Sequence, residues 1–398
     1  MKISGAQAII EILMEQGVDI VFGYPGGRIL PVFDAIYDGV IRNILTVHEQ
    51  GAIHAADGYA RASGKVGVCI ATSGPGATNL VTGLANAYLD SVPLVVITGQ
   101  VPTDLIGNDA FQEVDITGIT MPVTKHNFLI RNAASLPEIM RFAFKIASSG
   151  RPGPVLIDIP SDVQTALLTF PPEDEQWKNK PGFQWELSDL GSKLIDGAVE
   201  VIEGARQPVM IVGGGVVSSG AYGQVIALAE KINTPVVSTL MGLGVFSSDH
   251  PLFLGLTGLH GHKAANLAVH DADVVIAIGS RFNDRITGNK LKYGEGKIVI
   301  HIDVDPAELD KNIATPIPLA GAVKQLVEVL HQRIPYLNHC LWWDVIQEWK
   351  ERFKENPDGG VLSAPWMLQQ VAKMAKGESY IFATDVGQHQ MWAAKISG

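Results

Sequence analysis

The chain has 398 residues, enough for two or three domains of ordinary size, each with its own core. With 46% hydrophobic and 18% charged residues, its composition is typical of a soluble globular protein and unlike that of a disordered chain. The net charge of −11 disfavours a nucleic-acid surface, and no apolar run approaches the length of a membrane span. The two cysteines lack metal-ligand spacing, which fits a reducing compartment, and we expect a cytoplasmic protein that binds neither nucleic acid nor membrane.

The first part of the chain predicts an α/β domain. Ser4 caps a helix whose apolar residues recur at helical spacing, and Gly17 ends that helix. The runs that follow are continuously apolar, which is typical of strands buried on both faces of a parallel sheet. We expect strands at residues 20–23, 45–47, 66–71, 94–98 and 155–159, with helices at 50–63 and 77–89. Residues 1–165 therefore form one predicted domain.

Residues 166–187 combine proline and acidic residues without periodicity, which predicts a linker. A second α/β pattern covers residues 188–330. Its predicted strands lie at residues 208–212, 235–237, 272–278 and 297–302. Residues 331–398 predict a Trp-rich helix at 342–349, a helix at 365–375 and one strand at 380–383. The predicted fold class is α/β, with successive doubly wound parallel sheets and a third domain that is only begun.

Glu49 is the most informative single residue, because it stands between a predicted strand and an alanine-rich helix. Strand ends in open α/β sheets face the ligand crevice, so a carboxylate flanked by Val47, Ala52 and Ile53 would be poorly solvated and suited to acid–base chemistry. The alternative is an acid in the first helical turn that only stabilises the helix dipole. The local pattern leaves both interpretations open.

Three glycine-rich loops follow predicted strands. The loop around Gly26 lets backbone approach a ligand closely, although a tight turn without ligand has the same pattern. The loop at residues 71–79 opens a helix and offers amides and hydroxyls, but it is neither a dinucleotide fingerprint nor a P-loop. Gly214 lies in a run of three glycines after a strand of the second domain, a weak indication of a nucleotide phosphate site.

Three further clusters lie in the second domain. His260 and His262 flank Gly261, but the spacing offers no third metal ligand, so contact with a polar ligand is favoured. Residues 280–285 place two arginines after a strand, where they would hold phosphates or form a solvated loop. Residues 301–305 close another strand with two acids, as in sites for ribose hydroxyls. Together the clusters predict a site of dinucleotide size.

Six motifs, in order along the whole chain, resemble the large subunit of thiamine-diphosphate-dependent acetolactate synthases. They are Tyr24-Pro25-Gly26-Gly27, His48-Glu49-Gln50-Gly51-Ala52, Asp57-Gly58-Tyr59-Ala60-Arg61, Thr72-Ser73-Gly74-Pro75-Gly76, Ser149-Gly150-Arg151-Pro152-Gly153-Pro154 and Arg281-Phe282-Asn283-Asp284-Arg285. The resemblance implies a pyrimidine-binding domain at residues 1–165 and a central domain like the family's FAD-binding one at 188–330. Residues 331–398 would then be a connector and the truncated start of the pyrophosphate-binding domain.

By this resemblance, Glu49 activates the cofactor through its aminopyrimidine ring. The enzyme would decarboxylate pyruvate and join the hydroxyethyl carbanion to pyruvate or 2-oxobutyrate, in branched-chain amino acid biosynthesis. The implied catalytic residues are Glu49, Gly27, Gln112 and Lys125, and the substrate contacts, from a facing subunit, are Phe111, Gln112 and Lys125. The implied cofactor contacts are Glu49, Pro25, Gly26, Gln388 and His389 for thiamine diphosphate, and Arg151, Gly214, His260, Gly261, Arg281, Asp284, Arg285 and Asp303 for FAD.

The chain departs from the family pattern in three places. Leu259 stands where plant relatives have Met, and Ser161 where they have Lys. The Gly-Asp-Gly and the later Asn that hold magnesium do not occur, so we expect no metal ligands in this chain. We therefore expect a truncated large subunit that is inactive by itself.

The resemblance also implies partners: 2-oxo acids as substrates, a homodimer or homotetramer, and a small regulatory subunit. FAD would be structural, with no net redox role. Two alternatives stay open on the sequence. The first is another thiamine-diphosphate-dependent 2-oxo-acid decarboxylase or carboligase, and the second is a non-catalytic, cofactor-binding remnant that pairs with an intact subunit.

Overall fold

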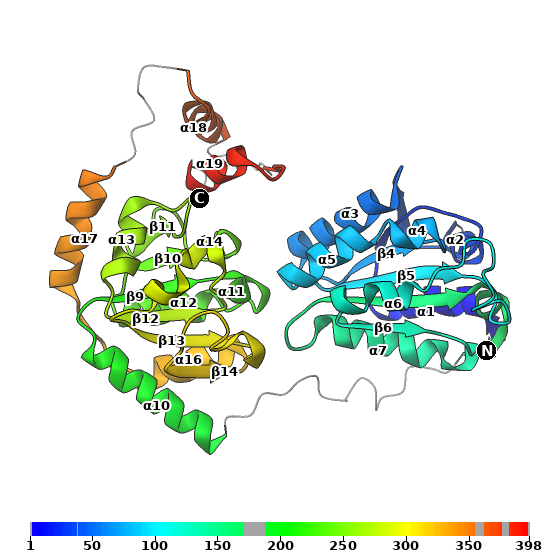
Figure 1. Ribbon diagram of the computed structural model, residues 1–398, viewed down its shortest axis with the longest axis horizontal. Helices are drawn as coiled ribbons and strands as arrows, with labels where there is room; N and C mark the ends of the chain where they lie inside the picture. The colour runs from blue at the N-terminus through cyan, green and yellow to red at the C-terminus, as the bar shows by residue number, and fades with distance from the viewer. Residues whose placement is uncertain (1, 38, 171–187, 355–361, 376–381, 397–398) are drawn as a thin grey trace. The chain divides into compact units, whose positions relative to one another are not determined.

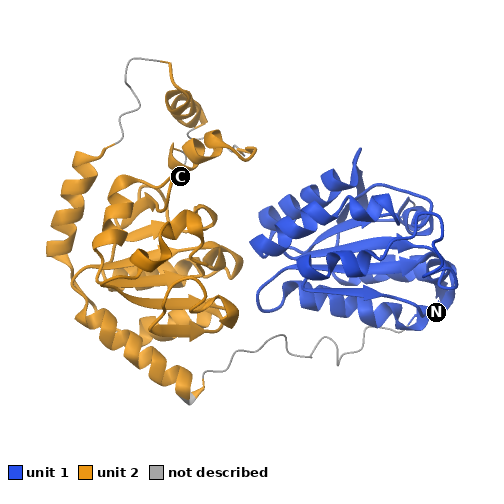
Figure 2. Ribbon diagram, in the orientation of Figure 1, with its two compact units in different colours: residues 1–184 blue, residues 185–398 orange. Residues whose placement is uncertain are grey.

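The computed structural model describes residues 2–37, 39–170, 188–354, 362–375 and 382–396. The chain divides into two compact units, residues 1–184 and 185–398 (Figure 2). Within the described ranges, no helix is both long enough and apolar enough to cross a membrane.

Unit 1 contains a six-stranded parallel sheet with the strand order β3-β2-β4-β5-β7-β6 (Figure 1). The central strands β4, β5 and β7 are buried along their whole length, because helices cover both faces of the sheet. The strands are β2 (Ile20–Gly23), β3 (Arg42–Leu45), β4 (Gly67–Ala71), β5 (Leu94–Gln100), β6 (His126–Leu129) and β7 (Pro154–Pro160). This is the α/β arrangement that the apolar runs predicted.

The helices of unit 1 divide between the two faces of its sheet. Helices α1 (Gly5–Glu15), α2 (Leu30–Tyr37) and α7 (Leu136–Ser148) pack on one face, and α3 (Glu49–Ser63) and α5 (Val81–Asp90) pack on the other. Short helices and a two-stranded antiparallel sheet complete the unit. They are α4 (Pro75–Thr78), α6 (Ile116–Thr120), α8 (Ser161–Thr165), β1 (Lys2–Ser4) and β8 (Leu167–Thr169).

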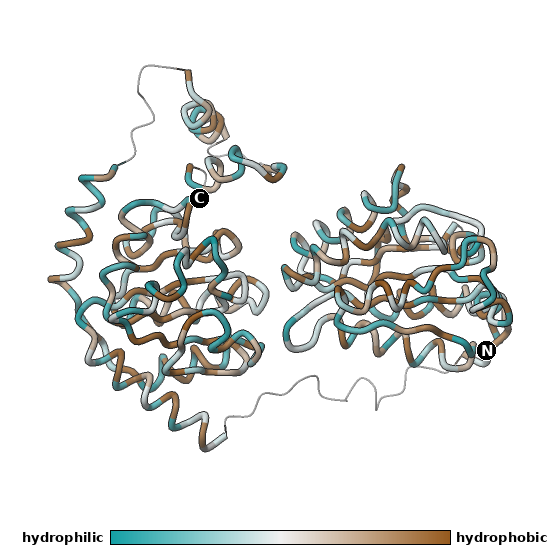
Figure 3. The backbone as a smooth tube through the Cα atoms, in the orientation of Figure 1, coloured by the Kyte–Doolittle hydropathy of each residue, from teal (hydrophilic) through white to brown (hydrophobic). Residues whose placement is uncertain are grey.

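Unit 2 contains a second six-stranded parallel sheet, with the order β11-β10-β9-β12-β13-β14. Its strands, like those of unit 1, are predominantly hydrophobic (Figure 3). The strands are β9 (Pro208–Val212), β10 (Val236–Ser238), β11 (Phe253–Leu256), β12 (Val274–Ile278), β13 (Ile298–Asp303) and β14 (Ile317–Ala320). Both sheets thus have the doubly wound form.

Helices cover both faces of the second sheet as well. Helices α10 (Asp189–Gly204), α12 (Tyr222–Lys231) and α16 (Val323–Arg333) pack on one face, and α13 (Lys263–Asp271) and α17 (Cys340–Arg352) on the other. In the Trp-rich α17, the Trp342 indole donates to the Pro208 carbonyl at 3.0 Å. The remaining helices are α11 (Gly214–Ser218), α14 (Asp284–Thr287), α15 (Lys290–Tyr293), α18 (Ala364–Ala375) and α19 (Gln388–Ile396).

The structure corrects several predicted boundaries. The predicted strand at 45–47 is wrong, because β3 ends at Leu45 and the Val47 side chain is 98% exposed. The predicted helix at 77–89 is two helices, α4 and α5. Strands β6, β11 and β14 were not predicted. The predicted strand at 380–383 lies partly outside the described residues, and its last two residues form no strand.

In each sheet the chain adds strands on one side of its first strand and then crosses to the other side, which is the reversal point; the first sheet also doubles back at its far edge, where β7 lies between β5 and β6. In unit 1 the reversal falls between β2 and β4, and in unit 2 between β9 and β12. Ligands of open α/β sheets bind at the carboxyl ends of the strands beside such a reversal. The loops that leave these four strands are therefore the expected positions of bound ligands.

Candidate functional site

In unit 1, the loops after β2 and β4 touch each other at the reversal point. A Cβ added at Gly26 would lie 2.5 Å from Thr72 Cγ2, so the close approach requires glycine. The Arg28 amide donates to Thr72 Oγ1 at 3.2 Å and closes the loop. A Cβ at Gly27 would meet no described atom within 4 Å, so Gly27 borders open space. Pro25 lies in the same loop.

Glu49 is the first residue of α3 and is only 8% exposed. Its Oε2 accepts a hydrogen bond from Asn79 Nδ2 at 2.9 Å, and a Cβ at Gly76 would lie 3.1 Å from its Oε1. Ala52 and Ile53 are buried as predicted, whereas the exposed Val47 does not shield the carboxylate in this chain. Glu49 is thus both a first-turn acid and a buried group held from the neighbouring loop.

Gln112 joins the same group of loops. Its carbonyl oxygen lies 2.8 Å from the position of a Cβ at Gly74, whose φ of +59° also favours glycine. Gln112 itself has φ +60°, a conformation that non-glycine residues rarely adopt. Phe111, next to Gln112 in the chain, is 80% exposed. In the facing loop, next to Gly74, the hydroxyl of Ser73 is buried without a hydrogen-bond partner among the described residues. Gln112 therefore lies beside the loop that contacts Glu49.

Lys125 lies elsewhere, just before β6 and hence at the amino-terminal edge of the sheet. Its Nζ donates to the Ile146 carbonyl and, at 2.7 Å, to the Ser149 carbonyl, at the end of α7. Burial lowers the pKa of Lys125 to about 8, and the charge of Arg151 acts in the same direction. Within one chain Lys125 caps a helix, and its catalytic role stays a prediction.

Replacement of Lys125 with Met should weaken unit 1. The variant keeps the aliphatic stem but loses two charge-assisted hydrogen bonds to helix-end carbonyls, at a cost of about 1–3 kcal/mol. Urea unfolding followed by circular dichroism would measure this loss. The control is Lys65→Met, which removes an exposed ion pair with Asp19 and should change little. Equal stability of the two variants would contradict the capping role.

In unit 2, the glycine loops after β9 and β12 are interlocked. A Cβ at Gly213 would overlap the Gly279 carbonyl oxygen, and a Cβ at Gly215 would lie 2.6 Å from Gly279 Cα. The Gly215 amide donates to that carbonyl at 3.0 Å, and Gly279 has φ +60°. The Ser280 hydroxyl is buried without a hydrogen-bond partner among the described residues. Gly214 thus lies in a backbone cradle that excludes side chains.

The turn that follows Gly279 after β12, and the end of β13, lie at the same carboxyl edge of the sheet. Phe282 is 1% exposed and has φ +49°, and its ring contacts those of Tyr293 and His301 at centroid distances of 5.8 and 5.0 Å. This buried anchor sets the turn that begins with Arg281. Asp303, the last residue of β13, is 7% exposed and accepts from the Asp305 amide at 2.9 Å.

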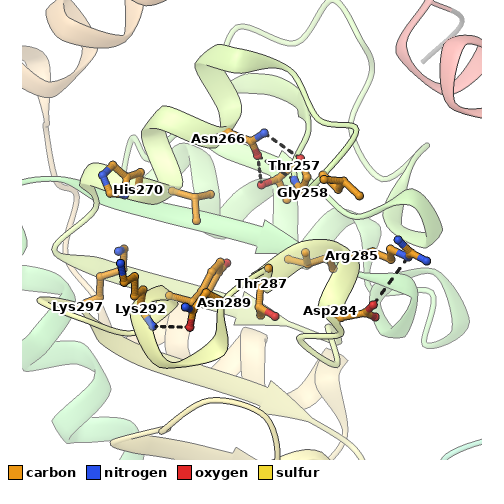
Figure 4. A pocket seen from close by; sticks show the side chains of 15 residues that line it. Thr257, Gly258, Asn266, His270, Asp284, Arg285, Thr287, Asn289, Lys292 and Lys297 are labelled. Atoms are coloured by element: carbon orange, nitrogen blue, oxygen red, sulfur yellow. Dashed lines mark hydrogen bonds and ion pairs between the residues drawn. The ribbon is translucent and has the colours of Figure 1, made fainter.

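The loop after β11 reaches the same edge. The Leu259 amide donates to the Arg285 carbonyl at 2.7 Å, and Asn266 holds Gly258 through both of its side-chain amide atoms (Figure 4). His262 Nδ1 accepts from the Leu256 amide at 3.0 Å, so this ring supports the loop. In the described ranges, no three His, Cys, Asp or Glu side chains form a metal cluster.

A pocket of about 340 Å³ adjoins this loop (Figure 4). Its walls come from residues 257–259, α13, α14 and α15, and include Asp284 and Arg285. Both side chains are exposed, and Arg285 Nε lies 3.9 Å from Asp284 Oδ2. The volume is in the range of small-molecule sites, about 300–1,000 Å³.

The structure therefore groups the predicted residues in two sets. Unit 1 places Glu49, Pro25, Gly26, Gly27 and Gln112 around the first reversal point. The carboxyl edge of the second sheet carries Gly214, His260, Gly261, Arg281, Asp284, Arg285 and Asp303. Arg151 lies in unit 1, where its Nε donates to Ser91 Oγ at 2.8 Å, and Gln388 and His389 lie on α19. The cofactor contacts predicted for all of these residues stay predictions.

Sequence reasoning did not single out Thr72 or Asn79, although both lie in the predicted loop at 71–79. Their positions in a polar loop after a strand are a signal, but which side chain reaches Glu49 depends on how the loop folds. The motif around Asp57 proves to be part of a structural network. Asp57 pairs with Arg61, which also contacts Asp90.

Comparisons with known proteins agree with the geometry. The family description "Thiamine pyrophosphate enzyme, N-terminal TPP binding domain" matches residues 3–119, and "Thiamine pyrophosphate enzyme, central domain" matches residues 195–330. A probable acetolactate synthase large subunit of Methanocaldococcus jannaschii is 48% identical, over 98% of this chain and 68% of that protein. An acetolactate synthase of Arthrospira platensis is 45% identical, over 99% and 70%, and an acetolactate synthase large subunit of Haemophilus influenzae is 43% identical, over 99% and 70%.

Proposed function

This chain belongs to the acetolactate synthase large-subunit family, and we propose that it acts in decarboxylating pyruvate and condensing the two-carbon unit with pyruvate or 2-oxobutyrate. This reaction belongs to branched-chain amino acid biosynthesis. The observation that carries the proposal is the buried Glu49, held by Asn79 at the reversal point of the first sheet.

The residues around Glu49 suit thiamine diphosphate. The close contacts at Gly26 and Gly76 leave no room for side chains, and the buried Ser73 hydroxyl lacks a partner among the described residues. When bound, the cofactor supplies the electron sink for decarboxylation. Glu49 Oε1 would exchange a proton with a ring nitrogen, while Asn79 keeps the carboxylate oriented. Ala52 and Ile53, just after Glu49 in α3, are buried in the core.

The carboxyl edge of the second sheet suits FAD. Three observations support this: the interlocked loops at Gly213 and Gly279 allow close backbone approach, the Ser280 hydroxyl is buried without a hydrogen-bond partner among the described residues, and Asp303 is an acid at a strand end, as in sites for ribose hydroxyls. We propose that Gly214, Arg281 and Asp303 contact FAD there and that the flavin has a structural role. Among the described residues, no group of three His, Cys, Asp or Glu side chains could hold the magnesium ion.

We also propose partners. Two of the similar proteins are named large subunits, which supports binding of a small regulatory subunit. The substrates would be 2-oxo acids. The exposed Phe111, beside Gln112, suits a contact with a second copy in a homodimer or homotetramer. Cytoplasmic location is part of the same proposal.

Product analysis tests the proposed function. The sequence leads us to expect that this chain is inactive by itself, so acetolactate formed by it from pyruvate, with thiamine diphosphate, magnesium and FAD supplied, would support the proposed reaction and contradict that expectation. Acetaldehyde or another ligation product in place of acetolactate would instead indicate a different decarboxylase or carboligase. A chain that binds thiamine diphosphate and gives no product even when it is paired with an intact large subunit carrying the Glu49→Gln change would indicate a non-catalytic remnant. Dialysed protein should retain flavin absorbance, and its loss would contradict the FAD assignment.

A further inference from the structure

One buried carboxyl group in unit 1, that of Asp158, has no role in the proposed chemistry. Asp158 lies in β7 between apolar neighbours and is 2% exposed. A carboxyl in such a strand needs hydrogen-bond partners. Thr98 Oγ1 donates to Asp158 Oδ1 at 2.7 Å, and Gln100 Nε2 donates to Oδ2 at 2.8 Å, both from the adjacent β5.

Gln100 connects this carboxyl to the loop that contains Val114, 14 residues further along the chain. It is 3% exposed, and its Nε2 also donates to the Val114 carbonyl at 2.9 Å. Its Oε1 accepts from the Val101 amide at 2.9 Å. Because Nε2 faces two acceptors and Oε1 faces a donor, the amide has one favourable orientation. Asp158 therefore determines how Gln100 holds Val114.

Val114 belongs to the segment of residues 107–115, which carries Phe111 and Gln112. Glu113 organises this segment internally, since its carboxylate accepts from the amides of Gly107 and Ala110. The bond from Gln100 ties this segment to the sheet. Two residues before that tie, Gln112 meets Gly74 in a left-handed conformation, beside the loop that contacts Glu49.

We propose that Asp158 is a positioning residue. It acts through Gln100 to hold the segment 107–115, with Gln112, against the loop of residues 71–79 that contacts Glu49. The expected effect of Asp158 on substrate binding rests on the proposed function, whereas its effect on the order of the segment 107–115 does not. Burial raises the pKa of Asp158 to about 7, the bonds from Thr98 and Gln100 oppose this rise, and the charge of Asp115 adds to it. Both protonation states retain an oxygen that accepts from Gln100.

Gln100→Met tests the connection with little change of volume. Hydrogen exchange in the segment 107–115 should become about five- to tenfold faster, as expected for the loss of one tethering hydrogen bond. The matched control is Gln164→Met. Gln164 is also buried, and its Nε2 donates to the carbonyls of Arg28 and Ile159, both at 2.8 Å. This control should loosen the loop at residues 24–28 and leave 107–115 unchanged.

Two substitutions at Asp158 separate hydrogen bonding from packing. Asp158→Asn can still accept from Gln100 and donate to Thr98, so exchange should match the wild type. Asp158→Leu should loosen the segment as Gln100→Met does. Unchanged exchange in Gln100→Met, or faster exchange throughout unit 1, would overturn the proposal even if the leucine variant fails to fold.

Kinetics complete the test. In the active holoenzyme, Gln100→Met should raise KM for pyruvate several-fold more than it lowers kcat. Asp158→Asn should keep both kinetic constants at their wild-type values, whereas Asp158→Leu should change them as Gln100→Met does. Faster exchange in 107–115 with unchanged KM would support the positioning role and count against Gln112 as a substrate contact. Failure of the inference and failure of the proposed function are thus distinguishable.

Discussion

Glu49→Gln is expected to lower the rate of acetolactate formation by about 10²- to 10⁴-fold, the range of general acid–base catalysis. Glutamine has nearly the same shape, and its amide oxygen can still accept from Asn79 Nδ2, so α3 should remain in place. It cannot, however, hold or release a proton at the cofactor ring. The loss should therefore appear in kcat, measured as acetolactate formed from pyruvate.

The matched control for this prediction is Glu138→Gln. Glu138 is also an acid in the first turn of a helix, α7, but it is exposed and distant in sequence from every predicted site residue of the reversal point. If Glu49 acted only on its helix dipole, both variants would lose a little stability and no activity. Wild-type activity in Glu49→Gln would therefore reject the catalytic assignment.

Gly213→Ala is expected to destabilise unit 2 by about 1–3 kcal/mol or more, the cost of overpacking a tight contact. The backbone at Gly213 has φ −116°, which alanine adopts freely, so the penalty is steric. The new methyl would overlap the Gly279 carbonyl oxygen, which is backbone and has little freedom to move. Separation of the two loops should also weaken FAD retention.

Urea unfolding followed by tryptophan fluorescence would measure this effect, since the buried Trp342 reports on unit 2. Gly197→Ala serves as the control, because Gly197 lies within α10 and a Cβ there meets no described atom within 4 Å. That change should stabilise the helix by about 0.5–1 kcal/mol. A wild-type unfolding midpoint for Gly213→Ala would show that the loops are not interlocked in solution.

The central strands were predictable because local sequence carries their signal. A strand with helices on both faces must be apolar throughout, so β4, β5, β7, β9 and β12 could be read from their composition. The four edge strands β3, β6, β11 and β14 were misplaced or missed. An edge strand has one neighbour and less buried surface, so its sequence need not be continuously apolar.

The candidate site was predictable in part for the same reason. Glu49 and the glycine of each loop follow strand ends, and the six motifs, by their residues and their order, indicated the family. Lys125 could not be placed from the sequence, because its helix-end acceptors come from residues 21 and 24 positions away. The link from Asp158 to Val114 could not be predicted either, because it passes through Gln100 on the neighbouring strand.

The amino-acid sequence by itself determined the α/β class, the buried strands, the family and the identity of Glu49 as a candidate acid–base group. These features depend on local patterning and on motifs of adjacent residues. Only the tertiary structure decided that Asn79 holds Glu49, that Gly213 needs its hydrogen because Gly279 faces it, and that Asp158 reaches the loop of Gln112. Each of these is a contact between residues distant in the chain, and such contacts are set by how the strands are ordered in the sheet.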